Sequence, residues 1–426
     1  MIKKTIRSSF LQGLSLGAAQ TLIRLAFGFA SIKVTAVYLG PSGLALVAQL
    51  LNMINLCQGV LTNGSMTAVL NLGAEYRSDP KRRRELFSSA LRLSLGLTAI
   101  CTVVLLITMP WTMPWIFAGQ SRPVAYVIAC FAILAGSAAI IINSAFNSAG
   151  EMGRITVIQI SLTIVGFIIF VPSAYFFGIN GALVATALTP LIALAIPALT
   201  VGRRSSIQWI DFGVKGETSA LRKILAFYPM LLVHAGAGSL TLLLVRDLAV
   251  RHLGLESAGI WQATWRLSEQ YLAIIMTSVS LYFMPKIGSL TSQPTAMRHE
   301  VLGTLLRVIG LTLAAATLLF MAREWVVLIV FTPSFHAVTE LMPLQLVGDV
   351  LKMGAWILAM AMTTLMRTRW YIACELLVPA TFIGVASLLI DRYGAQAMTW
   401  GYAASGLVHL GMGSYALRDM VFRRPV

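Results

Sequence analysis

The stretch PLQLVGDVLKMGAWILAMAMTTLM, residues 343–366, decides how this chain folds. It is long enough to cross the hydrocarbon core of a bilayer as a helix, and Asp349 and Lys352 are its only charged residues. A charge at the centre of a membrane helix costs about 2.5 to 3.5 kcal/mol, so ionisable residues there usually face a polar interior. Because residues three apart share a helix face, the stretch predicts a membrane-spanning helix with two opposite charges on one face.

The composition of the whole chain agrees with this stretch. Of the 426 residues 58% are hydrophobic and 11% are charged, and the mean hydropathy is +0.81, which excludes a single soluble core. The net charge of +16 would suggest nucleic acid in a soluble protein. Here most Lys and Arg lie in short segments between apolar runs, so we expect them to face membrane lipids and predict no nucleic-acid partner.

Four cysteines lie singly in apolar runs, with no spacing to one another or to histidine that would hold a metal. They are Cys57, Cys101, Cys130 and Cys374. We interpret all four as buried thiols, and the sequence predicts neither a metal site nor a cofactor.

Twelve apolar windows are long enough to span a membrane. They are 10–37, 44–72, 88–110, 123–147, 156–176, 182–201, 224–250, 259–284, 301–322, 343–366, 370–390 and 397–417. The shortest gaps follow Tyr38, Phe177 and Arg367. The sequence therefore predicts an all-α integral membrane protein with twelve transmembrane helices.

The distribution of cations predicts the orientation of these spans. With both termini in the cytoplasm, the inner segments hold 21 Lys or Arg and the outer loops hold 4. Residues 1–19 also resemble a secretory signal, with three cations before an apolar run. Cleavage there would leave the first span too short to cross, so we interpret these residues as part of that span.

Short motifs recur in the two halves of the chain. Leu39-Gly40 precedes the second span and Leu253-Gly254 precedes the eighth, while aromatic-Gly pairs at 177–178 and 393–394 precede the sixth and the twelfth. With a polar connector at 202–223, these motifs predict two pseudo-symmetric six-helix bundles, 1–213 and 214–426, around a central cationic cavity. Such turns also recur by chance in polytopic proteins.

Seven cations lie inside the predicted spans, and together they predict an anionic cargo. They are Arg24, Lys33, Arg92, Arg246, Arg266, Arg307 and Lys352. The long stems of Arg92, Arg307 and Lys33 could instead carry their charges to the headgroups. Arg24 lies mid-span and cannot do so easily.

Three pairs of opposite charge stand within these spans: Arg266 with Glu269, Asp349 with Lys352, and Arg246 with Asp247. Each pair could merely neutralise itself, which would let a charge sit in the bilayer without any cargo. Alternatively, the cations bind cargo and the carboxylates change protonation to couple transport to an ion gradient. The sequence leaves both interpretations open.

No Walker A loop, GxSxG, HExxH or pair of aspartates in a polar loop occurs in the chain, so we do not expect an enzyme. A membrane-embedded glycosyltransferase or ligase would need a large outer loop with catalytic groups. The longest outer loop, 323–341, is short and apolar.

Four motifs carry a resemblance to a known family. They are QLVGDVLKMG at 345–354, GIWQ at 259–262, SLYFMP at 280–285 and LGPSGL at 39–44. With these motifs the chain resembles the Wzx polysaccharide-lipid flippases of the MOP exporter superfamily. The likeness is closest to the branch that moves the lipid-linked repeat unit of enterobacterial common antigen.

The resemblance implies two bundles of helices, twelve or fourteen in all, around a V-shaped cavity in a bacterial inner membrane, with alternating access. It implies an undecaprenyl-pyrophosphate-linked oligosaccharide as cargo, and polysaccharide polymerase and chain-length proteins as partners. By position it implies cavity charges at Lys33, Arg246, Glu269, Asp349 and Lys352. Arg24 stands where the family has another cation, and Arg266 has no clear counterpart.

Two alternatives to this function remain. A drug or metabolite antiporter of the MATE type would share the architecture, but it exports mainly cations, which a cavity rich in Arg and Lys does not favour. A scaffold for polysaccharide enzymes would leave the charges at membrane depth unexplained.

Overall fold

The computed structural model describes residues 2–202, 205–213 and 218–421. All regular elements within these ranges are helices, and eight of them are long and apolar enough to cross a membrane. The expectation of an all-α membrane protein is therefore confirmed. Arg203, Arg204 and Lys215 of the predicted connector lie outside the described residues.

Three helices are each long enough to cross a membrane twice. They are α1 (Ile2–Glu75), α5 (Met152–Ala198) and α7 (Tyr228–Ser289), with 74, 47 and 62 residues. Each contains one glycine with non-helical backbone angles: Gly40 in α1, Gly178 in α5 and Gly254 in α7. These glycines lie in the gaps predicted between neighbouring spans.

The glycines of the sequence repeat adopt matching backbone angles. Gly40 has φ 66° and ψ −170°, and Gly254 has φ 82° and ψ 171°. Gly178 has φ 55° and ψ −138°, while Gly394, which ends α11 (Thr368–Tyr393), has φ 55° and ψ −134°. These angles are nearly closed to residues with a Cβ atom. The two halves of the chain thus make the same two turns at corresponding positions.

The described chain forms two compact units. The first unit comprises Met1–Leu39 and Leu46–Ser239, and the second comprises Gly40–Ala45 and Leu240–Val426. The six residues from Gly40 pack with the second unit because Gly259 has no side chain. A Cβ atom at Gly259 would lie 1.9 Å from the carbonyl oxygen of Pro41.

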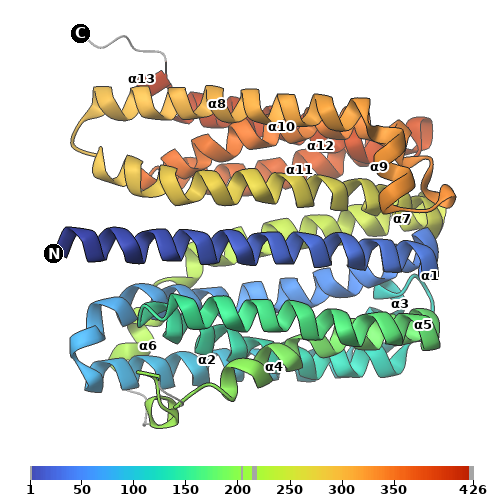
Figure 1. The fold of residues 1–426 in the computed structure, drawn as a ribbon. Helices are drawn as coiled ribbons and strands as arrows, with labels where there is room; N and C mark the ends of the chain where they lie inside the picture. Colours follow the sequence, from blue (N-terminus) through green and yellow to red (C-terminus); the bar gives the residue numbers. More distant parts are fainter. Residues whose placement is uncertain (1, 203–204, 214–217, 422–426) are drawn as a thin grey trace. The chain divides into compact units, whose positions relative to one another are not determined.

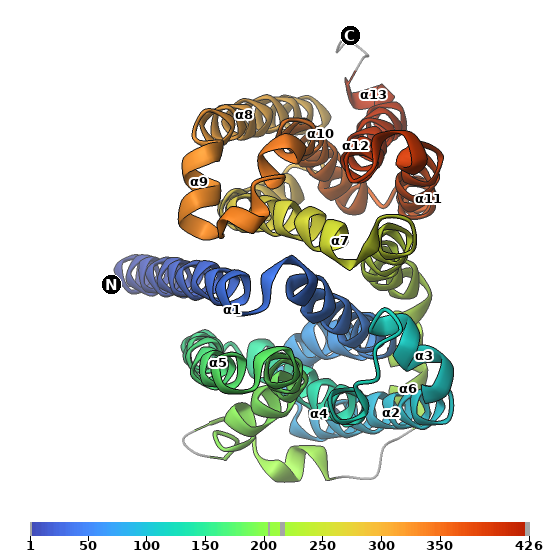
Figure 2. The ribbon, with the colours of Figure 1, turned by 90° about the vertical axis from the view of Figure 1, so that its right-hand side faces the viewer.

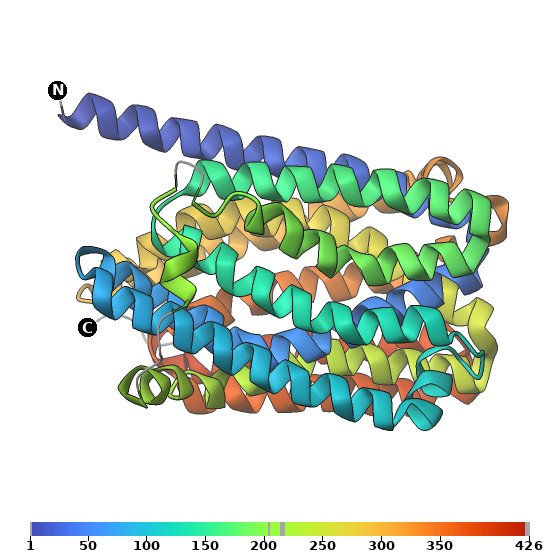
Figure 3. The same cartoon turned by 90° about the horizontal axis from the view of Figure 1, so that it is seen from below.

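The first unit contains α2 (Pro80–Ile107), α3 (Met109–Ile116), α4 (Pro123–Ser148), α5 and α6 (Thr218–Leu225) beside most of α1. Helix α4 packs against α2 and α5. Figures 1 and 3 show the first half of α1 running along α5, where the rings of Phe27 and Phe167 lie 5.0 Å apart. The short 3-10 helices η1 (Tyr76–Ser78) and η2 (Trp209–Phe212) lie in the loops of this unit.

The second unit contains most of α7, then α8 (Pro294–Met321), α9 (Arg323–Val330), the 3-10 helix η3 (Pro333–Phe335), α10 (Val338–Thr364), α11, α12 (Gln396–Ala416) and α13 (Arg418–Val421). Helix α10 packs against α8 and α12, as the end-on view of Figure 2 shows. Gly348 and Gly406 let α10 and α12 approach closely, since a Cβ atom at Gly348 would meet the Tyr402 ring at 2.5 Å. This close contact positions the charged residues of α10.

Candidate functional site

The carboxylate of Asp349 is the polar centre of the second unit. Its side chain is completely buried on α10. One oxygen, Oδ2, accepts hydrogen bonds from Ser268 Oγ and Tyr271 Oη, both at 2.7 Å, and Oδ1 accepts one from Tyr402 Oη at 2.8 Å. These partners stand on α7 and α12, so one carboxylate joins three helices. Gln345 extends the network by donating from Nε2 to Ser268 Oγ at 3.1 Å.

Lys352 follows Asp349 by one turn, but in the described part of the chain the two form no ion pair. The ammonium of Lys352 instead lies 5.0 Å from the ring centre of Trp265 and 5.4 Å from that of Tyr402. Aromatic faces attract a cation without neutralising it. The self-neutralising interpretation predicted that Asp349 would pair with Lys352. Three hydroxyl donors instead occupy both oxygens of the Asp349 carboxylate.

Arg266 and Glu269 form the ion pair that their spacing allowed. Arg266 Nη1 lies 3.1 Å from Glu269 Oε2, and Trp265 donates from Nε1 to Glu269 Oε1 at 2.8 Å. Both side chains remain partly exposed, 27% for Arg266 and 39% for Glu269. The Arg266–Glu269 pair is therefore partly accessible to solvent, whereas Asp349 is fully buried.

Arg246 is among the largest fully buried side chains of the chain. It donates to Gln262 Oε1, and its guanidinium lies 5.8 Å from the ring centre of Trp261. The adjacent Asp247 has another partner in the described chain. Asp247 binds Arg251 at 2.9 Å, because neighbours on a helix point about 100° apart while residues four apart face each other.

Contacts between aromatic rings connect these charged groups to one another. The rings of Trp261 and Trp265 lie 5.9 Å apart, and those of Trp265 and Tyr402 lie 5.0 Å apart. We call the set the cation–aromatic cluster: Arg246, Trp261, Trp265, Arg266, Glu269, Asp349, Lys352 and Tyr402. Three cations stand there against two carboxylates, so the cluster has one more basic than acidic side chain.

The remaining predicted site residues lie outside this cluster. Arg24 is exposed and Lys33 is half-buried, and both belong to the first unit. Arg307 is exposed on α8, where its Nη2 lies 3.4 Å from Glu300, nearer the start of the same helix. The Arg307 side chain therefore points toward the start of α8, as expected if it carries its charge toward the headgroups.

Sequence reasoning missed the neutral residues in and around the cluster. Ser268 and Tyr271 stand three residues apart, and so on one helix face, in the span that also carries Glu269, which was a usable signal. Tyr402 gave no such signal, since it lies 53 residues from Asp349 and in a different span. Trp261 and Gln262 appeared only in the motif of the family resemblance.

The described residues contain no group of three His, Cys, Asp or Glu side chains that could hold a metal ion. All four cysteines are free. Cys130 and Cys374 are buried as expected, but Cys57 and Cys101 are only partly buried, which corrects the interpretation of four buried thiols.

Comparison with known proteins places these observations in context. No family model matches the chain. It is 25% identical over 407 residues to the Lipid III flippases of Escherichia coli (strain K12) and Shigella flexneri, with 93% of this chain and 95% of each relative covered.

Solved structures share the fold. The chain superposes on an inward-facing multidrug resistance MATE family transporter of the MOP superfamily with a TM-score of 0.75 and 16% identity, covering 94% of both chains. A MOP superfamily transporter from Pyrococcus furiosus, described as having a binding pocket of reverse polarity, matches with a TM-score of 0.61 and 16% identity, covering 96% of this chain and 93% of that one.

Proposed function

We propose that this chain is a flippase for a lipid-linked oligosaccharide, because it is 25% identical to the Lipid III flippases and has the fold of MOP superfamily transporters. The proposed cargo is an undecaprenyl-pyrophosphate-linked oligosaccharide, moved from the cytoplasmic to the periplasmic leaflet. The proposed cycle is alternating access coupled to an ion gradient, with protons as the coupling ion.

The physical problem of such a cargo matches what the cluster offers. A pyrophosphate with several sugars cannot cross hydrocarbon, and a prenyl chain cannot leave it, so the carrier must supply a charged surface inside the membrane. One observation carries the proposal. The ammonium of Lys352, on a helix apolar enough to cross a membrane, stands against two aromatic faces, while the carboxylate on the same helix face is occupied by three hydroxyls.

Arginine and lysine would contribute differently to binding. The planar guanidinium of Arg266 or Arg246 can donate two parallel hydrogen bonds to a phosphate, whereas Lys352 acts as a point charge. The proposed substrate-binding residues are Arg24, Lys33, Arg246, Arg266, Arg307 and Lys352, and the proposed ion-coupling residues are Glu269, Asp349 and Asp247. Among these residues we favour the ones that the cluster brings together, which are Arg246, Arg266, Lys352, Glu269 and Asp349.

The arrangement in the membrane is part of the same proposal. We keep twelve crossings, the two bundles 1–213 and 214–426, and both termini in the cytoplasm of a bacterial inner membrane. Three broken helices and the matched glycine turns support the crossings. Polysaccharide polymerase and chain-length proteins are the proposed partners.

Flipping in proteoliposomes tests the proposal. The probe is a fluorescent undecaprenyl-pyrophosphate-linked oligosaccharide, and its outer-leaflet fraction is read by a quencher that does not cross the membrane. We expect flipping by the natural protein, a loss of at least about tenfold in Lys352→Gln, and recovery in Lys352→Arg, since tenfold corresponds to about 1.4 kcal/mol of lost binding. Lys286→Gln, an exposed site on α7 outside the cluster, is the matched control.

A MATE-type antiporter is the alternative from the same fold. The shared fold favours it, but three cations against two carboxylates in the cluster do not suit a cationic drug. Transport of a cationic dye by the same proteoliposomes, with no movement of the lipid-linked probe, would replace our proposal with this alternative.

A further inference from the structure

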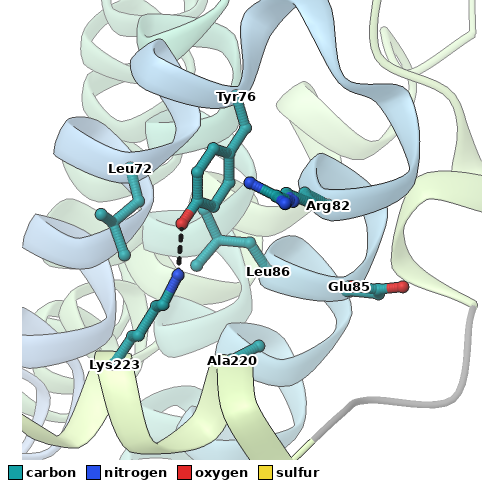
Figure 4. A pocket seen from close by; sticks show the side chains of 7 residues that line it. All are labelled: Leu72, Tyr76, Arg82, Glu85, Leu86, Ala220 and Lys223. Carbon is teal, nitrogen blue, oxygen red and sulfur yellow. Dashed lines mark hydrogen bonds between the residues drawn. The ribbon is translucent and has the colours of Figure 1, made fainter.

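A second group of cations lines a pocket in the first unit, whereas the cation–aromatic cluster belongs to the second unit. The pocket has a volume of about 280 Å³ and lies among the end of α1 with η1, the start of α2, and α6 (Figure 4). Its lining residues are Leu72, Tyr76, Arg82, Glu85, Leu86, Ala220 and Lys223. Small-molecule pockets usually measure about 300 to 1,000 Å³, so this one suits a headgroup better than a whole lipid.

Two cations converge on one buried ring in this pocket. Tyr76 is 8% exposed, and its hydroxyl accepts a hydrogen bond from Lys223 Nζ at 2.8 Å. Lys223 Nζ lies 5.4 Å from the centre of the same ring, and the Arg82 guanidinium lies 6.0 Å from it. Figure 4 shows both cationic groups directed at Tyr76, Lys223 from α6 and Arg82 from α2.

The acidic neighbours do not cancel this charge. Glu85 lines the pocket, but Figure 4 shows its carboxylate pointing away from Lys223, and it lies 3.9 Å from Lys81. Arg82 forms an ion pair with Asp79, with Nε 3.3 Å from Oδ2, but its side chain is 65% exposed. A ligand with one negative charge would therefore meet two cations without displacing a buried ion pair.

The pocket is expected at a membrane surface. It opens at the point where α1 ends and α2 begins, between two of the helices that are apolar enough to cross a membrane. In the connector of this unit Trp209 is 53% exposed, and Leu225, just after it at the end of α6, is 46% exposed. Exposed tryptophan and leucine beside cations are typical of segments that lie among lipid headgroups.

We propose that this pocket binds the phosphate of an acidic phospholipid headgroup between Lys223 and Arg82. The phosphate accepts hydrogen bonds from both side chains, and the acyl chains remain in the bilayer beside α1 and α2. Since Lys223 belongs to α6 and Arg82 to α2, the bound lipid fastens the connector helix to the turn between α1 and α2. This inference depends on the membrane location of the chain and not on the identity of its cargo.

Native mass spectrometry of the full-length protein tests this site. Protein in detergent is mixed with phosphatidylglycerol or with phosphatidylcholine, and the retained lipid is counted. We expect preferential retention of phosphatidylglycerol, and a fall of about fivefold in Lys223→Gln and in Arg82→Gln, the effect of one basic contact to an acidic lipid. Lys223→Arg should retain the lipid.

The control is Arg222→Gln, which removes the same charge from the adjacent position of α6 but does not line the pocket. Three results would overturn the proposal. They are equal retention of the two lipids, an equal loss in Arg222→Gln, and displacement of phosphatidylglycerol by millimolar inorganic phosphate, which would indicate a site for free anions. Loss of the lipid in Lys223→Arg as in Lys223→Gln would likewise exclude recognition by charge.

Discussion

Removing the hydroxyl of Tyr402 should destabilise the second unit more than removing that of Tyr271. Both hydroxyls donate to the buried carboxylate of Asp349, at 2.8 Å and 2.7 Å, but they reach different oxygens. Tyr402 is the partner of Oδ1, whereas Oδ2 also receives a hydrogen bond from Ser268. Tyr402→Phe therefore leaves one charged oxygen without a donor, and Tyr271→Phe does not.

The structure sets the size of this difference. A hydrogen bond to a charged group contributes about 1.5 to 3 kcal/mol, and an orphaned buried oxygen loses that full amount. A hydrogen bond between membrane helices whose acceptor keeps another donor is worth about 0.6 kcal/mol on average. We expect Tyr402→Phe to cost about 1 to 2 kcal/mol more than Tyr271→Phe in free energy of unfolding.

Equilibrium unfolding of the detergent-solubilised protein by SDS, followed by tryptophan fluorescence, measures both costs. Tyr415→Phe, at a half-exposed tyrosine of the same helix, is the control and should change little. The double variant Asp349→Asn with Tyr402→Phe should show a smaller effect of Tyr402→Phe than the natural background. Equal costs for the two tyrosines, or a larger cost for Tyr271→Phe, would refute the reasoning.

Three further predictions concern other parts of the chain. Reporter fusions after Arg84 and Lys223 should be cytoplasmic and one after Gln120 periplasmic, and a periplasmic signal at either of the first two would exclude the twelve-span topology. Burial alone would raise the pKa of Glu151, but hydrogen bonds from Ser206 and Ser205 and the charge of Arg154 outweigh it and hold that pKa below its ordinary value of 4.5. Glu151 therefore stabilises the folded state above pH 4.5, and this stabilisation is lost as the pH falls through the lower pKa of the folded state. The melting temperature of Glu151→Gln should consequently vary less with pH in that range than that of the natural protein. Gly259→Ala should lower the free energy of unfolding by about 1 to 3 kcal/mol or more, because its Cβ atom would overlap the Pro41 carbonyl. In Gly238→Ala, on the same helix, the added Cβ atom meets nothing, so this control should fold normally. Equal melting temperatures of the two variants would contradict the close contact.

Local signals in the sequence were sufficient for the fold class. Long apolar runs allow little besides membrane helices, and the turns at Gly40, Gly178 and Gly254 were visible as short breaks between spans. The structure adds that each pair of repeated glycines has nearly the same backbone angles, which no spacing could show. The family resemblance carried by the four motifs was also confirmed, since the chain is a distant homologue of Lipid III flippases and shares a fold with MOP superfamily transporters.

Partner choice among the charges could not be predicted in the same way. Spacing placed Asp349 beside Lys352, yet the carboxylate took its donors from residues 53 to 81 positions away. Such donors become available only through helix packing, here the close approach of α10 and α12 at Gly348. Where partners stand on one helix, as with Arg266 and Glu269, spacing alone was enough.

The two carboxylates of the cluster are consequently suited to different tasks. Asp349 is fully buried, and its three donors stand on helices α7 and α12, so a change in its contacts requires a change in helix packing. Glu269 is 39% exposed and is bound to Arg266, which is itself accessible to an anion. A pyrophosphate that takes the donors of Arg266 would release Glu269 from its partner. We infer that Glu269 senses the occupied state of the cluster, whereas Asp349 holds the three helices on which the cluster is built.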